Sequence, residues 1–566
     1  MVNTETFFRR AQWVIAILIT GVSILFHLYY WLHVGGLWRD EVNLVNLSGH
    51  HTLAEMERDS FPLLMPVTLH AWMAVGLGNS DLALRLLGLL IGLGILAALW
   101  VSSWKIRREP PMIGLVLLSL NNAVIFFGDS LRAYGLGSLL AVILTASAFV
   151  YVQRPSMARA AWLALFAILS VQILYHNAVL VAAVCFGAWA VCWRRKDGRA
   201  ALQVLAVAVL SAASLLPYAH TLTSPGDPTL HSGVELPRLF ATYTDTLGYP
   251  RSGYIYIWAA LYAVIVTCAC TGFWKKSGEP PAAERIDPRG GDGPSPRAER
   301  FVGTSCPHPD KDLSLFAAKM LTVAVVGFPV FFWRSRMPMQ SWYLLPFLAS
   351  TAVCFDAALP FRRAIGRAFV LVFVLVTASL SIPETNAILK SHFSDVDIYA
   401  RQLTVAASPD DYIIVEPWHF GITFGHYFKG RTPWDTLPPI SDHATHRFDL
   451  VALEMQNTNA IAPVLEKIGQ TLQSSHRVWV LSMEGRLSVP GRGMRPPATL
   501  PVPPLPDTGW ADWPYDRVWA AQVMCFIADH SGQFQELKSL SNERSIAEEM
   551  SLFMAQGWNT NSAEHK

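Results

Sequence analysis

Two carboxylates lie side by side where the first long apolar run of this chain ends. The stretch GLWRDEVNLVNLS places Asp40 and Glu41 directly after that run. A positioned carboxylate can remove a proton from a reacting hydroxyl group. Any helix that leaves a bilayer also needs polar residues, so the pair alone does not separate a catalytic role from a structural one. The catalytic and the structural role can be separated only by the segments around the pair.

The composition indicates a polytopic membrane protein. Charged residues make up 15% of the chain and hydrophobic residues 52%, whereas about a quarter of the residues in soluble domains are charged. Apolar runs of about 20 residues recur through the first two-thirds, and each can cross a hydrocarbon core of about 30 Å. The net charge is +2, and no basic stripe interleaved with aromatic residues points to nucleic acid. The seven cysteines form no CxxC pair, which argues against a structural disulfide or a cysteine zinc site.

The apolar runs predict about eleven spanning helices. We place them at 11–32, 82–104, 111–127, 134–152, 160–175, 178–193, 201–218, 254–273, 313–332, 342–359 and 364–382. Basic residues concentrate in alternate connections, which are therefore expected to face the cytoplasm. An odd number of spans then sends the Asp40 loop and the C-terminus to the opposite side. The expected location is the plasma (inner) membrane, with the site and the C-terminal domain extracytoplasmic.

Three extramembrane segments divide the chain further. The first outer loop, 33–81, contains FPLLMPVTLHAWMAVGL, whose two prolines favour a helix along the membrane surface over a span. The cytoplasmic loop 275–312 is rich in Gly, Pro and charge and is predicted to be disordered. In the tail, YIIVEP and RVWVLSM are typical of buried strands, and IAPVLEKIGQTLQSS is helical. The predicted domains are a membrane domain, 1–383, and an α/β domain, 384–566.

The order of the polar segments resembles the GT-C membrane glycosyltransferases, particularly the branch with the protein O-mannosyltransferases and the lipid A aminoarabinose transferase. The Asp40–Glu41 pair opens the first outer loop, as it does in that family. Three further segments carry the resemblance: Phe61-Pro62-Leu63 in place of a Pro-Pro-Leu segment, Gly78, Ser80 and Arg85 as G-x-S-x-x-x-x-R, and Trp342-Tyr343-Leu344-Leu345-Pro346 as R-Y-x-x-P. The arginine of the last motif is missing, and Arg334 and Arg336 lie a few residues earlier. The resemblance covers residues 11–382.

This resemblance implies the GT-C fold and an inverting transferase that moves a sugar from a polyprenyl-phosphate donor to a hydroxyl on a lipid, glycan or protein. Asp40 would be the general base, with its pKa held above about 4 by desolvation. Glu41 would share that role or orient Asp40. A departing phosphate needs cations, and Arg132, Arg334 and Arg336 lie on the expected face.

The remaining candidates have competing interpretations. His176 and Tyr343 are candidates for donor binding, although Tyr343 also suits an aromatic belt and Arg132 an interfacial arginine. No cofactor motif is present; a divalent metal stays an alternative, with Asp59 as its weak candidate ligand.

Two other functions compete with transfer. A transporter or flippase of a lipid-linked or anionic substrate would predict matched halves and charges near the bilayer midplane. The notable charges instead cluster at one face. A non-catalytic scaffold that binds a partner through its tail is the third interpretation, and an intact Asp40 with outer arginines argues against it.

Overall fold

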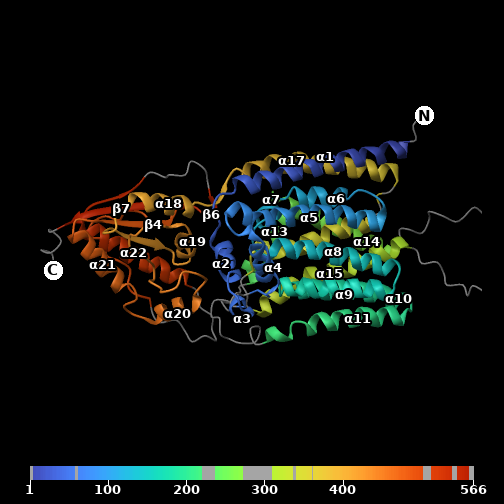
Figure 1. Ribbon diagram of the computed structural model, residues 1–566. Helices are drawn as coiled ribbons and strands as arrows, with labels where there is room; N and C mark the ends of the chain where they lie inside the picture. The colour runs from blue at the N-terminus through green and yellow to red at the C-terminus, as the bar shows by residue number, and fades with distance from the viewer. Residues whose placement is uncertain are drawn as a thin grey trace, which may run out of the picture.

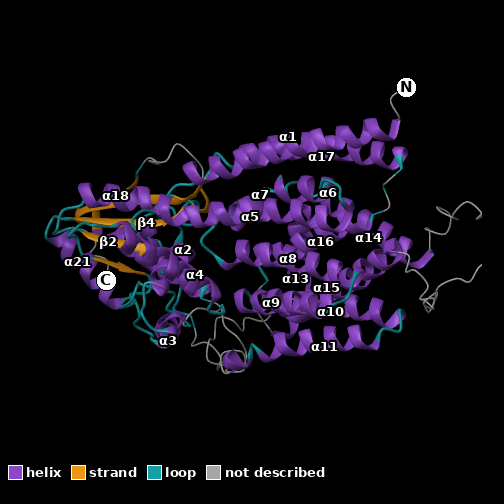
Figure 2. Ribbon diagram, turned by 45° about the vertical axis from the view of Figure 1, so that its right-hand side comes forward, coloured by secondary structure: helices purple, strands orange, loops and turns teal. Residues whose placement is uncertain are grey.

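A bundle of long apolar helices carries an α/β domain at one end (Figure 1). The computed structural model describes residues 4–57, 61–219, 236–271, 309–335, 339–359, 361, 363–500, 512–537 and 545–559. Figure 2 shows the described strands gathered at that end, whereas the bundle consists of helices joined by loops.

Eleven helices build most of the bundle. They are α1 (Thr4–His33), α5 (Asp81–Arg107), α8 (Ala133–Gln153), α9 (Met157–Ile173), α10 (Asn177–Arg194), α11 (Gly198–Ala213), α13 (Leu236–Gly248), α14 (Tyr254–Thr271), α15 (Pro309–Ser335), α16 (Leu345–Ala358) and α17 (Ala364–Ile388). Within the described ranges, seven helices are long and apolar enough to cross a membrane, and three apolar helices are shorter. The predicted fold class, a polytopic helical membrane protein with a C-terminal α/β region, is confirmed. The α13 helix has no counterpart among the predicted spans.

The predicted span over 111–127 is not one helix. It consists of α6 (Met112–Gly114), a π-helical segment (Leu115–Ser119) and α7 (Asn122–Gly128). The break falls at Asn121, whose side-chain oxygen accepts a hydrogen bond from Ala123 N at 2.9 Å and starts a new helix. Thr385 Oγ1 donates to the freed carbonyl of Leu120 at 2.8 Å. An interrupted helix is tolerated inside a membrane bundle when it is buried in protein and its polar groups form hydrogen bonds, as they do here.

The first outer loop folds into short helices between the bundle and the C-terminal domain (Figure 1). These are α2 (Arg39–Ser48), α3 (Leu53–Met56) and α4 (Leu64–Trp72), the last continuing into a π-helical turn at Met73–Leu77. Two acidic residues in the first turn of α2 suit the positive end of the helix dipole. That α4 lies along a membrane surface stays a prediction.

The C-terminal domain contains a five-stranded sheet in the order β3-β2-β4-β7-β5. Its strands are β2 (Tyr412–Glu416), β3 (Trp434–Thr436), β4 (Arg477–Met483), β5 (Ser531–Glu536) and β7 (Met550–Trp558). β2 runs parallel to β3 and β4, and β7 pairs antiparallel with β4 and β5. The predicted strands YIIVEP and RVWVLSM correspond to β2 and β4, and the predicted helix before β4 is α21 (Ala462–Gln473).

Helices cover both faces of this sheet. In β2, Tyr412 and Ile414 pack into a core with α20 (Phe448–Gln456), α21 and α22 (Trp513–His530). The alternating residues Ile413 and Val415 pack instead against α18 (Val396–Ala406) and α19 (Phe420–Tyr427). A strand buried on both faces has no polar side, which explains the continuous apolar run in its sequence.

A small second sheet joins the domain to the bundle. Its strands β1 (His392–Ser394) and β6 (Ser545–Glu548) are parallel, and Gly35, just after α1, bridges to Ser394. Helix α17 continues past the predicted domain boundary at Glu384 to Ile388. Most of the predicted disordered loop 275–312 lies outside the described residues.

Candidate active site

Asp40 lies in the first turn of α2, beneath the C-terminal domain, and its side chain is 18% exposed. Three cationic or hydrogen-bonding side chains surround the carboxylate. His446 Nε2 lies 3.2 Å from Oδ1, Arg39 Nε lies 3.7 Å from Oδ1, and Arg132 Nε lies 4.0 Å from Oδ2. Arg132 also donates a hydrogen bond to the main-chain oxygen of Asp40 at 3.2 Å. The carboxylate therefore sits between the bundle and the domain, in contact with both.

The electrostatics of Asp40 differ from the sequence expectation. Burial by itself raises the pKa of Asp40, but Arg132, the His446 hydrogen bond and Arg39 together outweigh it. The pKa of Asp40 consequently lies well below its usual range, whereas we expected desolvation to hold it above about 4. The expectation was wrong because the sequence did not show that three partners would meet around one carboxylate. Asp40 is ionised at neutral pH and is thus in the state that accepts a proton.

Glu41 has a different environment from its neighbour. Its side chain is 1% exposed and pairs with Arg85 of α5, itself 3% exposed, at 2.7 Å. Leu131 N donates to Oε1 at 2.9 Å, and Trp38 N donates to Oε2 at 3.3 Å. Arg85 also donates to the carbonyl of Gly36 at 2.7 Å. Glu41 thus ties the start of α2 to α5 and to the segment before α8, and both of its oxygens are engaged.

Arg132 immediately precedes α8 and stands over aromatic rings. Its guanidinium carbon lies 5.0 Å from the centre of the Phe61 ring and 6.0 Å from that of Tyr134. Tyr134 lies 5.7 Å from Tyr343, and Tyr343 lies 5.4 Å from His176. We call Phe61, Tyr134, Tyr343 and His176 the ring cluster. Cation–π contacts of this kind hold an arginine in place while its N–H groups remain donors.

The ring cluster brings together site residues that are far apart in the sequence. Asp40 contacts Arg132, Arg132 lies over the cluster, and the cluster contains Tyr343 and His176. His176 is 1% exposed, and burial lowers its pKa to about 3, so the ring is neutral. A neutral, buried histidine suits packing or hydrogen bonding, and not charge pairing with a phosphate.

The other predicted residues are less central. Arg334 is exposed in the last turn of α15, two residues beyond Phe332, whose ring stacks on Tyr343. Arg336 and Asp59 lie outside the described residues. In the part of the chain that the structure describes, no group of three or more His, Cys, Asp or Glu side chains is arranged to hold a metal ion.

The sequence interpretation did not identify the partners from the C-terminal domain. His446 contacts Asp40, and Glu548 of β6 pairs with Arg39 at 3.2 Å. These residues are 406 and 509 positions away from their partners. Nothing local in the sequence links them, although the polar run SDHATHRF before α20 is a recognisable loop signal.

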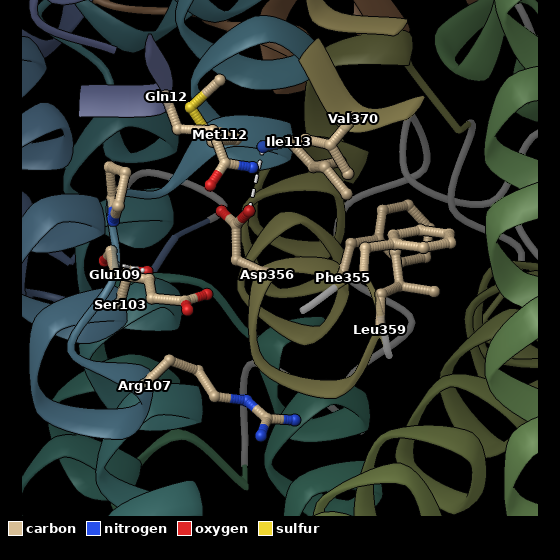
Figure 3. Close-up of a pocket in the computed structure, with 12 residues that line it drawn as sticks. Gln12, Ser103, Arg107, Glu109, Met112, Ile113, Phe355, Asp356, Leu359 and Val370 are labelled. Atoms are coloured by element: carbon tan, nitrogen blue, oxygen red, sulfur yellow. Dashed lines mark hydrogen bonds between the residues drawn. The ribbon is translucent and has the colours of Figure 1, made fainter. Parts of the chain in front are cut away.

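A cavity lies around Asp356, near the end of α16 (Figure 3). Ile113 N and Gly114 N donate to the two oxygens of Asp356 at 2.9 Å each. Nearby, Arg107 Nε donates to the carbonyl of Ala357 at 2.5 Å. These groups join α6 and α5 to α16, so the cavity's polar side chains have a structural explanation.

No protein-family model and no curated protein matches this chain. Solved structures match over most of its length. ArnT from Cupriavidus metallidurans in the apo state matches at a TM-score of 0.49 and 13% identity, covering 84% of this chain and 93% of that one. The same protein bound to undecaprenyl phosphate matches at 0.46 and 13%, covering 83% and 93%. The Archaeoglobus fulgidus oligosaccharyltransferase in complex with Zn and sulfate matches at 0.43 and 11%, covering 83% and 68%.

The kind of membrane transferase that the sequence motifs resemble is therefore among these structural matches.

Proposed function

We propose that this protein is an inverting membrane glycosyltransferase that moves a sugar from a polyprenyl-phosphate donor to a hydroxyl acceptor. The observation that carries the proposal is the position of an ionised carboxylate, Asp40, against the guanidinium of Arg132 at one end of a membrane bundle. A base and a phosphate-binding cation are the two groups that such a transfer requires.

In this mechanism, the acceptor hydroxyl attacks the anomeric carbon while Asp40 takes its proton. The bond between that carbon and the phosphate oxygen breaks, and its electron pair leaves with the lipid phosphate. Arg132 stabilises the charge that develops on the phosphate, and Arg334 and Arg336 are further candidates for that contact. The ring cluster beside Arg132 offers apolar faces to the sugar or to the lipid.

Donor binding also raises the pKa of Asp40, which is low in the protein without a donor. Arg132 is the strongest of the groups that lower the pKa of Asp40. When Arg132 engages a phosphate, its charge is shared with a second anion, and the pKa of Asp40 rises. A base whose proton affinity increases on donor binding is strongest when the reacting centre is present.

The arrangement of charges supports an extracytoplasmic site. Helix α5 begins at Asp81, which accepts a hydrogen bond from Tyr427 of the C-terminal domain, so its basic last turn with Arg107 lies at the far end of the bundle. By the positive-inside rule, the end that carries Asp40 faces away from the cytoplasm. At that face a lipid-linked donor replaces a nucleotide sugar. The acceptor is a lipid, a glycan or a protein.

Incubation of the purified protein with labelled polyprenyl-phosphate sugars tests this proposal. We expect release of the lipid phosphate with one donor and loss of transfer in Asp40→Asn by roughly 10²- to 10⁴-fold, the usual contribution of a general base. Donor binding should persist in this variant because Arg132 is unchanged. Asp410→Asn, at an exposed aspartate of the C-terminal domain, is the matched control. Near-normal transfer by Asp40→Asn would make Asp40 a structural residue, and movement of intact donor across vesicles without cleavage would favour a flippase.

A further inference from the structure

One face of α2 is bound along its length by a loop of the C-terminal domain. Asp40, Asn43 and Asn46 are three residues apart, so they lie on the same side of the helix. Asn43 Oδ1 accepts from His446 N at 2.9 Å, and Asn46 Nδ2 donates to the carbonyl of Ala444 at 2.7 Å. Together with the His446–Asp40 contact, these bonds place the loop in one register along the helix.

The loop itself is braced. Arg447 Nη1 donates to Asp442 at 2.7 Å, and Arg447 also forms two hydrogen bonds with Asp449, at 2.9 and 2.7 Å. The ring of His446 stacks on Phe448, with the ring centres 5.5 Å apart. The backbone of His446 is therefore held by Asn43, and its ring is held by Phe448. A residue that orients another side chain must itself be fixed in this way.

We propose that His446 is a positioning residue for Asp40, so that the C-terminal domain completes the active site by holding one oxygen of its base. This inference rests on the proposed function. An Nε2–H that donates to Oδ1 leaves Oδ2, on the Arg132 side, to accept the proton of the acceptor hydroxyl. A fixed carboxylate orientation contributes to rate because a misplaced base loses the near-attack geometry.

The same contact has an electrostatic consequence that can be measured. The hydrogen bond from His446 is one of the interactions that lower the pKa of Asp40. Removal of His446 therefore raises that pKa, and the ionised form of Asp40 is lost at a higher pH than in the wild type. Among the described residues, the charged and titratable groups that face Asp40 are Arg39, Arg132, Tyr134, His419, His446 and Glu548. The other five remain in the variant.

The test uses the protein with its C-terminal domain, in nanodiscs, with three variants: His446→Ala, His446→Gln and the control His51→Ala, which changes an exposed histidine that follows α2. With the labelled donor that the transfer assay selects, we expect His446→Ala to lower kcat by roughly 10- to 100-fold, less than the 10²- to 10⁴-fold contribution of a general base, because Asp40 itself remains. KM for the donor should stay within about twofold because Arg132 is unchanged. The acid limb of the rate should move to higher pH. His446→Gln, whose amide can still donate to Asp40, should recover much of the rate.

A second measurement does not depend on transfer. Isotope-edited infrared spectra, with Asp40→Asn as the reference, follow protonation of the Asp40 carboxyl directly. The inference holds if His446→Ala shifts this titration upward and His51→Ala does not. An unchanged titration, or wild-type kcat in His446→Ala, overturns it. If the wild type transfers no sugar although the Asp40 titration shifts, the proposed reaction fails while the positioning contact stands.

Discussion

Replacement of Glu41 by Gln should destabilise the protein more than replacement of the adjacent Asp40 by Asn. Glu41 and Arg85 are almost completely buried, at 1% and 3% exposure, and lie 2.7 Å apart. Removal of the carboxylate charge leaves the guanidinium of Arg85 buried and unbalanced. It also turns an amide N–H₂ toward one of the donors now bound by Glu41, namely Leu131 N, Trp38 N or Arg85. Breaking a buried pair from one side costs about 3–5 kcal/mol of unfolding free energy.

Asp40 is the internal comparison. It is 18% exposed, and its ion-pair distances to Arg39 and Arg132 are 3.7 and 4.0 Å. Long, partly solvated pairs contribute about 0–1 kcal/mol. Thermal unfolding of Glu41→Gln and Asp40→Asn in the same nanodiscs, followed by tryptophan fluorescence, should therefore separate the two carboxylates clearly. Glu41→Gln should lower the unfolding temperature more than Asp40→Asn.

The double variant Glu41→Gln with Arg85→Gln tests whether the loss of the Glu41–Arg85 ion pair causes the destabilisation. Because both changes remove the same pair, its destabilisation should be less than the sum of the two single effects. If Glu41→Gln unfolded at the wild-type temperature and still lost transfer, the ion pair would not stabilise the fold. Glu41 would then be the catalytic residue that the sequence also allowed.

Three further predictions address the phosphate side and the domain junction. Arg132→Ala should raise KM for the donor and lower kcat, because the phosphate is present before and during the reaction; steady-state kinetics on the labelled donor checks this, and an unchanged KM would contradict it. Arg334→Ala should leave the unfolding temperature unchanged, since Arg334 is exposed, and should weaken donor binding in a direct binding assay only if it reaches the lipid phosphate. Glu548→Gln should destabilise the junction by about 1–3 kcal/mol, because the buried Glu548 loses its charge-assisted hydrogen bonds with the partly exposed Arg39; faster proteolytic release of the C-terminal domain would show this, and equal protease resistance would refute it.

Local patterns were sufficient to predict most of the architecture. Helix α1, the strands β2 and β4 and the helix α21 follow from apolar periodicity and length alone, since each has a distinctive pattern. The break at Asn121 was missed because a buried, interrupted helix has the same overall hydropathy as a span. Asn121 and Asn122, adjacent in an apolar run, were the available signal.

The candidate site was predictable only in part. The sequence motifs named Asp40 and Arg132 as candidate site residues, and the structure places the two side chains in contact. The different environments of Asp40 and Glu41 were not predictable, since adjacent residues on a helix face different directions and meet different partners. His446 and Glu548 reach the site through tertiary contacts across more than 400 residues, which no periodicity records.

The junction between Arg39 and Glu548 also imposes an order on biosynthesis. Arg39 N and its guanidinium both donate to Glu548, which the ribosome adds 509 residues later. At about 5–20 residues per second, translation leaves Arg39 without this partner for roughly 25–100 s. During that interval the membrane helices can insert and pack, and until His446 is added, 406 residues after Asp40, the contact between these two residues is also absent. A chain interrupted within the tail would thus retain its membrane helices without the contacts that His446 and Glu548 make with α2.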